Sequence, residues 1–321
     1  MLMLGTGAGL FGLTNSNEFQ VEQGGPPSVA FLAAGPDATY ALTAAGALWL
    51  RPAGGGWREA HPRPVAAEAW SLAADPKLPG RLYIGVSPAM LHLSNDGGTS
   101  WKACESIRTI PGYDTWTFPP PPHIPHICSI AADPLVPGAV YIGVEEGGVY
   151  RSEDEGETWA SLNQGLDWDV HTILPAAQPG RLFATTGVGF HRSDDAGRSW
   201  RHITAGMDRR YTIPLVASGS DGSRVLTAAA ATPPPGWRAN GTANAAIFAS
   251  ADAGEHWTQA AEGLPARFDS MVRWLLSDAG RIFAISGKDV YTCLEGDFRW
   301  TALQTPNAGL TAAEVIPSPP A

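Results

Sequence analysis

Asp169 and His171 are the residues of this chain whose types and spacing best suit acid–base chemistry. They stand two apart in a segment expected to be a strand, where alternate side chains point to the same face. A carboxylate beside an imidazole orients the ring and raises its basicity, as in general-base pairs. We therefore predict His171 as a catalytic base and Asp169 as its catalytic partner. The alternative is a structural histidine beside an incidental acid.

Arg209, Arg210 and Tyr211 form a second polar run, which suits an anionic ligand. The fork of an arginine matches the geometry of a carboxylate or a phosphate. Arg210 and Tyr211 are predicted as catalytic contacts to an anion or oxyanion, and Arg209 as a substrate-binding residue. The alternative is that an arginine pairs with Asp208 or with a glutamate of the candidate site and so fastens neighbouring parts of the fold.

Two histidines and two adjacent glutamates complete the candidate site. Glu145 is predicted as catalytic, and His123, His126 and Glu146 are predicted to bind substrate. Imidazole and carboxylate groups are also ligands of transition metals. A divalent transition metal, held by His123, His126 and His171 with one glutamate, is therefore a further hypothesis, and the metal ligands stay unknown.

The spacing of His123 and His126 argues against that metal. Pro122 and Pro125 favour an extended chain. Three extended steps cover roughly 10 Å, which is too far for two donors on one zinc ion, although a turn would bring the two rings closer. No cofactor is established from the sequence.

Two insertions hold the remaining aromatic candidates. Residues 104–127 include Trp116 and a run of four prolines, and residues 232–245 include three prolines before Trp237. Proline runs with aromatic residues are expected to form stiff loops that hold a pocket wall in place. Trp116 and Trp237 are predicted to bind substrate by stacking on a sugar or aromatic ring. The alternative is that they fill the loops.

The elements that must position these residues are revealed by a repeat. The pattern S-x-D-x-G-x-x-W occurs four times, and each copy follows an apolar strand, a Pro/Gly turn and a second strand. Ser and Asp in such a turn bond the local backbone, and the glycine supplies a positive φ. The four copies are residues 94–101, 152–159, 193–200 and 250–257, and worn copies lie at 54–57 and 295–300.

Each repeat predicts a four-stranded antiparallel meander, which is the unit of a β-propeller. Second strands recur seven times along the chain, so we predict an all-β, seven-bladed propeller as one domain over residues 1–321. The chain opens on a second strand, whereas residues 313–318 resemble a first strand with no blade after it. We expect this C-terminal strand to join the N-terminal blade and so close the ring.

The repeat identifies a family resemblance. S-x-D-x-G-x-T-W is the Asp-box motif, and nearly the whole chain resembles the bacterial Asp-box (BNR-like) repeat propellers, in their uncharacterised glycosyl hydrolase or sialidase-like branch. Relatives of this kind include sialidases, sortilin-type receptors and photosystem assembly factors, so the resemblance implies a fold more than a function. Sialidases themselves have six blades and an F-R-I-P motif. The nearest match here, residues 211–214, lacks the arginine.

Composition excludes several classes of partner. The net charge of −10 opposes a phosphate backbone, and no basic stripe interleaved with aromatics is present, so nucleic acid is not an expected partner. No apolar run reaches the roughly 18 residues that span a bilayer. The start of the chain has no positive region like that of a signal peptide. We expect no membrane contact and a cytoplasmic location.

The sequence thus predicts a small-molecule enzyme of hydrolase or lyase type. Its polar site would lie at the channel mouth formed by blades four to six, on the face that carries the connections between blades. The expected substrate is a small polar or anionic molecule. The alternative is a non-catalytic propeller that binds a ligand or a protein or assists an assembly. Substrate identity and oligomeric state do not follow from the sequence.

Overall fold

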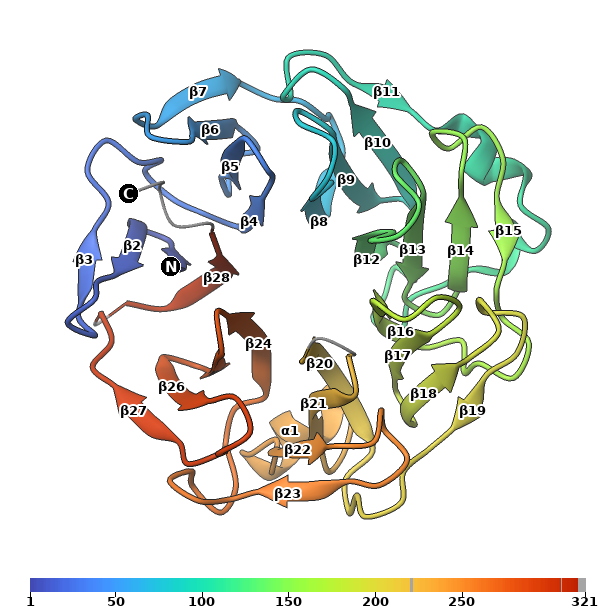
Figure 1. The fold of residues 1–321 in the computed structure, drawn as a ribbon. Coiled ribbons are helices and arrows are strands. Elements are labelled where there is room, and N and C mark those ends of the chain that lie inside the picture. The colour runs from blue at the N-terminus through green and yellow to red at the C-terminus, as the bar shows by residue number, and fades with distance from the viewer. Residues whose placement is uncertain (220–221, 307, 317–321) are drawn as a thin grey trace. The chain divides into compact units, whose positions relative to one another are not determined.

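The computed structural model describes residues 1–219, 222–306 and 308–316. Its strands form seven four-stranded antiparallel sheets, so the fold is the predicted seven-bladed β-propeller (Figure 1). Contacts between Cα atoms divide the chain into two compact units, which are described separately below. Unit 1 is Met1–Ser161 with Pro306–Ala321, and unit 2 is Leu162–Thr305. The single domain over 1–321 stays a prediction.

Unit 1 contains blades 1 to 4. In each blade the strands pair with their neighbours in chain order, except that the last strand of the chain comes first in blade 1. Blade 1 has β28 (Leu310–Val315), β1 (Leu2–Thr6), β2 (Gly9–Leu13) and β3 (Phe19–Val21); blade 2 has β4 (Phe31–Ala34), β5 (Ala38–Leu42), β6 (Leu48–Pro52) and β7 (Arg58–His61); blade 3 has β8 (Glu68–Ala74), β9 (Leu82–Ser87), β10 (Met90–Ser94) and β11 (Lys102–Ala103); blade 4 has β12 (Ile127–Ala132), β13 (Val140–Val144), β14 (Gly148–Ser152) and β15 (Ala160–Ser161).

Unit 2 contains blades 5 to 7, which share the same strand order. Blade 5 has β16 (Val170–Pro175), β17 (Leu182–Thr186), β18 (Gly189–Ser193) and β19 (Arg201–His202); blade 6 has β20 (Tyr211–Ser218), β21 (Arg224–Ala230), β22 (Ala246–Ser250) and β23 (Thr258–Ala260); blade 7 has β24 (Val272–Asp278), β25 (Arg281–Ser286), β26 (Asp289–Leu294) and β27 (Thr301–Leu303).

The C-terminal strand completes blade 1, as predicted. β28 pairs antiparallel with β1 from Leu2↔Val315 to Thr6↔Leu310, and the two strands lie side by side in Figure 1. The strand begins at Leu310 and ends at Val315, so the predicted bounds of 313–318 were wrong by three residues at each end. Residues 317 and 318 lie outside the described part of the chain.

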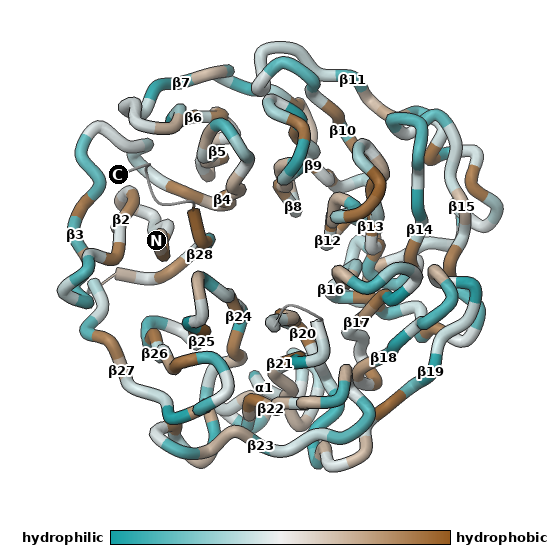
Figure 2. Tube along the Cα trace, in the orientation of Figure 1, coloured by the Kyte–Doolittle hydropathy of each residue, from teal (hydrophilic) through white to brown (hydrophobic). Residues whose placement is uncertain are grey.

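The core lies where sheets face each other. Within unit 1 one cluster joins blades 3 and 4, and within unit 2 another joins blades 5 and 6. All five residues of β13 and of β17 are buried, because a middle strand is covered on both faces. β24 and β28, each the first strand of its sheet, are brown over part of their length in Figure 2, where hydrophobic residues stand among polar ones.

The repeated turn is held by side-chain hydrogen bonds that are the same in all four copies. In blade 4, Ser152 Oγ donates to Asp154 Oδ1 at 2.9 Å and accepts from Gly156 N at 2.9 Å. Thr158 N donates to the same Asp154 oxygen at 2.9 Å. Corresponding bonds hold the turns of blades 3, 5 and 6. The local role predicted for Ser and Asp is confirmed.

The turn glycine is also required by close packing against the preceding blade or the segment that follows it. A Cβ added at Gly197 would lie 2.8 Å from Leu162 Cδ1, and one at Gly156 would lie 2.5 Å from Cys104 Sγ. The equivalent atom at Gly98 would collide with Leu48, and at Gly254 with Phe190. A side chain at this position would therefore push two blades apart.

Both insertions contain short helices, and the proline run of the second insertion is part of a helix instead of the expected loop. Residues 104–127 include the 3₁₀ turns Glu105–Thr109 and Tyr113–Thr115, and residues 232–245 include helix α1 (Pro234–Asn240). Proline fits the start of α1 because the first turn of a helix leaves its N–H groups unpaired. Gly241, at φ 69°, ends the helix in the left-handed region.

We predict that Trp200→Ala destabilises the protein by about 3–5 kcal/mol, because a large buried side chain is lost. Trp200 is 6% exposed, and its Nε1 donates to Leu162 O at 2.6 Å. Trp168→Ala is the matched control, because Trp168 is 54% exposed. Urea unfolding followed by circular dichroism measures both variants. Equal losses of stability would contradict the role given to Trp200.

Acid stability should depend on the turn aspartates. Hydrogen bonds from the Ser199 hydroxyl and backbone lower the pKa of Asp195 to about 2, against about 3.9 in an unfolded chain. The folded pKa is depressed, so the stabilisation is present above about pH 4 and is lost as pH falls toward 2. Between pH 5 and pH 2 the free energy of unfolding should therefore fall less for Asp195→Asn than for the wild type. Urea unfolding midpoints of both proteins at each pH measure this difference. Parallel pH profiles would refute this.

Candidate functional site

The predicted site residues fall in both units, and the part in each unit is described by itself. Glu145, Glu146, His123, His126 and Trp116 belong to unit 1. The rest of the predicted set belongs to unit 2: Asp169, His171, Arg209, Arg210, Tyr211 and Trp237.

A β-bulge recurs near one end of the first strand of six sheets. The register of β16 shifts between Val170 and Thr172, so His171 is the extra residue of the bulge. A bulge leaves one residue unpaired in the ladder and turns its side chain to a new direction. The other bulges place Trp70 in β8, Cys128 in β12, Ile213 and Pro214 in β20, Arg273 in β24 and Thr311 in β28.

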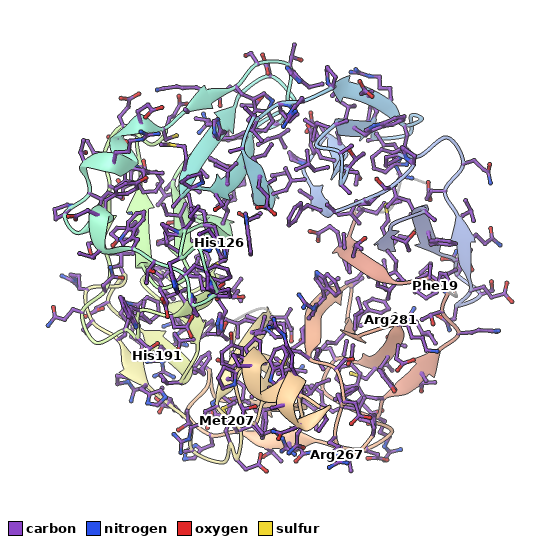
Figure 3. All side chains as sticks on the ribbon, turned by 180° about the vertical axis from the view of Figure 1, so that it is seen from behind. Phe19, His126, His191, Met207, Arg267 and Arg281 are labelled. Atoms are coloured by element: carbon purple, nitrogen blue, oxygen red, sulfur yellow. The ribbon has the colours of Figure 1, made fainter. Side chains whose placement is uncertain are left out.

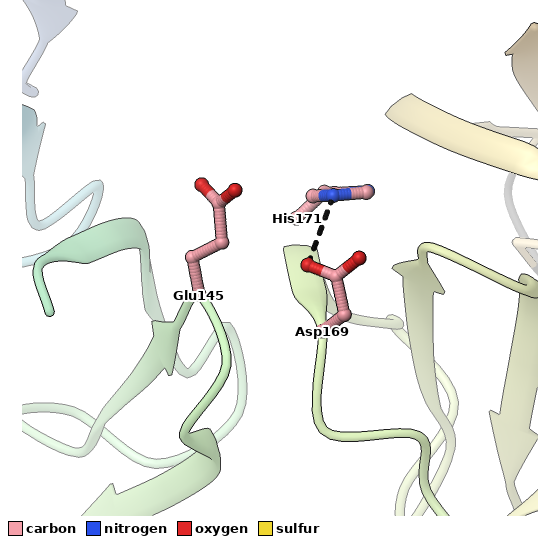
Figure 4. A group of neighbouring side chains, drawn as sticks. All are labelled: Glu145, Asp169 and His171. Carbon is pink, nitrogen blue, oxygen red and sulfur yellow. Dashed lines mark ion pairs between the residues drawn. The ribbon is translucent and has the colours of Figure 1, made fainter. Parts of the chain in front are cut away.

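Both ring nitrogens of His171 face oxygen atoms of the protein. Nδ1 lies 2.5 Å from Thr212 O, and because a carbonyl oxygen only accepts, Nδ1 carries the hydrogen and donates it. Nε2 lies 3.4 Å from Asp169 Oδ1, the ion pair that Figure 4 marks with a dashed line. The side chain of His171 is 6% exposed and that of Asp169 is 23% exposed. The predicted pair therefore forms in a largely buried setting.

The bond from His171 to Thr212 O joins blade 5 to blade 6. Thr172 Oγ1 and Thr185 Oγ1 of blade 5 likewise donate to Ile213 O of blade 6, at 2.8 and 2.7 Å. In unit 1, Ser71 Oγ donates across from blade 3 to Ile127 O of blade 4 at 2.7 Å. The His171 bond thus belongs to a set of side-chain bonds that fasten first strands to the next blade.

Tyr211 contacts His171, and Trp237 contacts Tyr211. The ring centroids of Tyr211 and His171 are 4.6 Å apart, and Trp237 meets Tyr211 edge-on at 5.7 Å. Trp237 sits in α1, half-buried, and its Nε1 donates to Thr232 O. Unit 2 thus brings four predicted residues into one cluster: Asp169, His171, Tyr211 and Trp237.

Both arginines bond protein groups within unit 2. Arg209 Nε donates to Asn244 O at 2.6 Å, and its Nη1 lies 2.7 Å from Asp208 Oδ1. Arg210 Nη1 donates to Thr204 Oγ1 at 3.1 Å. The pairing of Arg209 with Asp208, given above as the alternative to anion binding, is the one the structure contains.

In unit 1 the structure brings His126 and Glu145 together. His126 Nε2 lies 3.1 Å from Glu145 Oε2, and His126 has no exposed surface. Figure 3 labels His126, directly before β12. Its ring stacks on Trp70 with centroids 3.6 Å apart and meets the edge of Phe118 at 4.6 Å.

Trp70 and Phe118 are site neighbours that the sequence did not predict. His126 Nδ1 and Trp70 Nε1 are both buried without a hydrogen-bond partner among the described residues. Unpaired buried nitrogens cost stability, so this cluster is not optimised for packing alone. One signal was present in the sequence, because Trp70 stands outside the repeated turns.

His123 and Glu146, also predicted for this site, make contacts of their own. His123 is exposed at φ 65°, its N donates to Pro120 O at 3.0 Å, and its ring nitrogen Nδ1 lies 2.8 Å from Phe118 O. The chain there forms a turn, so the expected extended conformation was wrong. Glu146 occupies the turn after β13 at φ 49°, and its carbonyl accepts from Thr117 N at 3.3 Å.

Trp116 fills the first insertion instead of facing a pocket. It is 7% exposed, and its Nε1 donates to Tyr150 Oη at 3.1 Å beneath the turn between β13 and β14. A ring buried to this extent has no free face for a sugar or an aromatic ligand. Within unit 1 alone, and within unit 2 alone, the described residues gather no three His, Cys, Asp or Glu side chains into a metal-sized group.

No protein-family model and no curated protein matches the chain. Among solved structures it is similar to the GH74 xyloglucanase from Xanthomonas campestris (TM-score 0.66, 16% identity), covering 97% of this chain and 52% of that one. It is also similar to YCF48 from Cyanidioschyzon merolae (TM-score 0.62, 13% identity), covering 91% of this chain and 90% of that one. A structure of YCF48 bound to D1 peptide is similar as well (TM-score 0.60, 15% identity), covering 92% of this chain and 89% of that one.

These likenesses establish the propeller fold and leave the activity open, because all three identities lie at 16% or below. The chain spans about half the length of the GH74 enzyme, but about nine-tenths of each YCF48 chain. No helix in the described ranges is long and apolar enough to cross a membrane.

We predict that His171→Ala lowers stability by about 1–3 kcal/mol, the cost of leaving a buried carbonyl without its donor. His171→Asn should restore most of this loss, because its amide can donate to Thr212 O. The free energy of unfolding in urea measures both variants. If asparagine proves as destabilising as alanine, the bond to Thr212 is not what His171 contributes.

Proposed function

We propose that this protein is a non-catalytic, protein-binding propeller of the Asp-box type. The observation that carries the proposal is the engagement of His171. A general base needs a ring nitrogen that faces the substrate and can take its proton. Here Nδ1 donates to the main chain of the next blade and Nε2 faces Asp169. The residue best suited to catalysis by its sequence is thus used to join two blades.

The other polar candidates support the same proposal. Arg209 and Arg210 bond Asp208, Asn244 and Thr204. Anion recognition by an arginine fork depends on N–H groups that converge on the ligand. In Arg209 and Arg210, N–H groups bond other residues of the protein instead. Trp116 is a core residue. The chain therefore offers structural roles for most of the residues that the enzyme hypothesis requires.

Membership of the Asp-box group is part of the proposal. Its support is the repeated turn, whose Ser–Asp–Gly hydrogen bonds recur in blades 3 to 6 with matching distances. Similarity to YCF48 over nearly the full length of both chains adds to this, since one of those structures is described as bound to a D1 peptide. A cytoplasmic location, and the absence of nucleic-acid and membrane partners, remain proposals from composition.

Blade 5 presents an exposed surface suited to such a contact. Trp168 is 54% exposed and Val188 is 41% exposed. Both lie at the same end of the blade, since Gly187 N donates to Asp169 O at 2.9 Å and ties their two loops together. Exposed tryptophans flanked by polar groups are frequent centres of protein interfaces.

The test compares capture of a partner by three forms of the protein. Immobilised wild type, Trp168→Ala and Leu294→Ala are exposed to lysate of the source cells, and Leu294 is the control because it is an exposed apolar side chain elsewhere in unit 2. We expect a partner that the wild type and Leu294→Ala retain in equal amount and Trp168→Ala loses at least tenfold. Equal capture by all three would contradict a protein-binding role for this surface.

A hydrolase or lyase acting on a small polar molecule is the second candidate. The observation that favours it is the buried His126–Glu145 pair with its unpaired neighbouring nitrogens, together with the likeness to a GH74 xyloglucanase. Chromogenic glycosides and esters are the substrates to try. Turnover that Glu145→Gln lowers at least 100-fold at unchanged melting temperature would establish an enzyme and overturn the proposal above.

A further inference from the structure

A groove of about 540 Å³ lies in unit 2, where the outer part of blade 6 faces the last turn of blade 7. Its volume is in the range of ligand-binding cavities in proteins, roughly 300–1,000 Å³. None of the residues of the predicted site lines it. Its walls come from β22 and β23 with the turn between them, from the segment that leaves β23, and from the turn after β26: residues 249–252, 256, 258–262 and 297–298.

The groove borders the turn at which the repeat departs from its pattern in blade 7. In blades 3 to 6 a glycine three residues before the turn tryptophan lets the turn touch the blade or segment before it. Asp297 holds the equivalent position before Trp300, and the next residue, Phe298, has φ 51°. A non-glycine residue at positive φ is strained. The turn still contacts blade 6, because Arg224 lies 3.4 Å from Glu295 and Trp300 N donates to Glu262 O at 3.0 Å, and the groove lies beside these contacts.

Small side chains on the facing blade leave the groove open. Ala249, Ala251, Ala260 and Ala261 line the wall from blade 6, and Ala260 stands three residues after its turn tryptophan, at the position that Leu162 holds after Trp159. The alanine methyls and the ring of Phe298 make the lining predominantly apolar. An apolar floor of this kind suits short aliphatic side chains.

The rim of the groove is acidic. It carries the carboxylates of Asp252, Glu262 and Asp297, which are 45%, 70% and 52% exposed. Two side chains partner these three carboxylates. Arg299 lies 3.3 Å from Glu262 and 3.4 Å from Asp297, and His256 bonds Asp252 at 2.8 Å. That hydrogen bond from His256 holds the pKa of Asp252 well below its usual range, so this carboxylate stays ionised.

We propose that this groove binds a short segment of a partner protein in which lysine or arginine alternates with small apolar residues. The inference rests on the proposed protein-binding function and names the chemistry of a partner segment. Cationic side chains pair with Glu262 and Asp297 and lie over the ring of Phe298, where a cation–π contact adds to the attraction. The intervening aliphatic side chains cover the alanines.

The test uses two capped pentapeptides, VKVKV and VEVEV, and isothermal titration calorimetry at low and physiological salt. We expect VKVKV to bind at least tenfold more tightly than VEVEV. Glu262→Gln with Asp297→Asn should weaken VKVKV at least tenfold, and Ala251→Trp, which fills the groove from an exposed position, should do the same. Melting temperatures confirm that each variant is folded.

The control for overall charge is Asp167→Asn with Asp289→Asn, which removes two negative charges of unit 2 outside the groove and should leave VKVKV binding within twofold. A similar loss in this control would overturn the proposal, because the attraction would then be general. The proposal would also be overturned if spermidine competed for the groove as strongly as VKVKV does. The same holds if the protein self-associated through the groove and Ala251→Trp abolished that self-association. If VKVKV does not bind the groove but Trp168-dependent capture of a partner is observed, this inference alone is refuted. If neither is observed, the proposed protein-binding function is refuted as well.

Discussion

Close contact between each repeated turn and the blade or segment before it is the constraint on which blade packing depends. A four-stranded sheet cannot cover both of its faces alone, so each blade must meet its neighbour. The turn can approach to within van der Waals distance only where it has no side chain, as at Gly197 against Leu162. The side-chain hydrogen bonds of the turn serine and aspartate hold that glycine in place. In blade 7, where Asp297 stands at the position of this glycine, a groove lies beside the turn.

A second set of contacts joins the blades at their first strands. Bulges at equivalent positions turn single side chains toward the next blade, and hydroxyl or imidazole groups there donate to its carbonyl oxygens. Polar residues in a propeller are thus used for cohesion as well as for ligands. His171 shows how the two uses resemble each other, because a bond from Nδ1 to a carbonyl and a carboxylate near Nε2 suit both a general base and a histidine that joins two blades.

Much of the fold could be predicted from the sequence because its signals are local. The turn S-x-D-x-G-x-x-W places donor, acceptor and positive φ within eight residues, so its hydrogen bonds follow from the residues themselves. The pairing of Asp169 with His171 was foreseeable for the same reason, and so was that of Arg209 with Asp208. Even the union of β28 with β1 followed from counting strands, although β28 begins three residues earlier than expected.

The rest of the candidate site depends on contacts between distant segments, which leave no local signal. Trp70 stacks on His126 from another blade, and nothing near either residue announces the other. The helix at Pro234–Asn240 was missed because a proline run suggests an extended chain, yet proline is well accommodated in the first turn of a helix. Trp116 resembled a ligand platform by type alone, and its burial against Tyr150 decides otherwise.

The pairing of β28 with β1 has a consequence for how the protein is made. β1 emerges from the ribosome some three hundred residues before its partner, Leu310–Val315. Until then the apolar edge of β1 is open and able to pair with another nascent chain, the hazard of any unprotected strand edge. Blade 1 can be completed only after residues 310–315 have been made, so slow decoding between the two strands prolongs the time during which β1 lacks its partner.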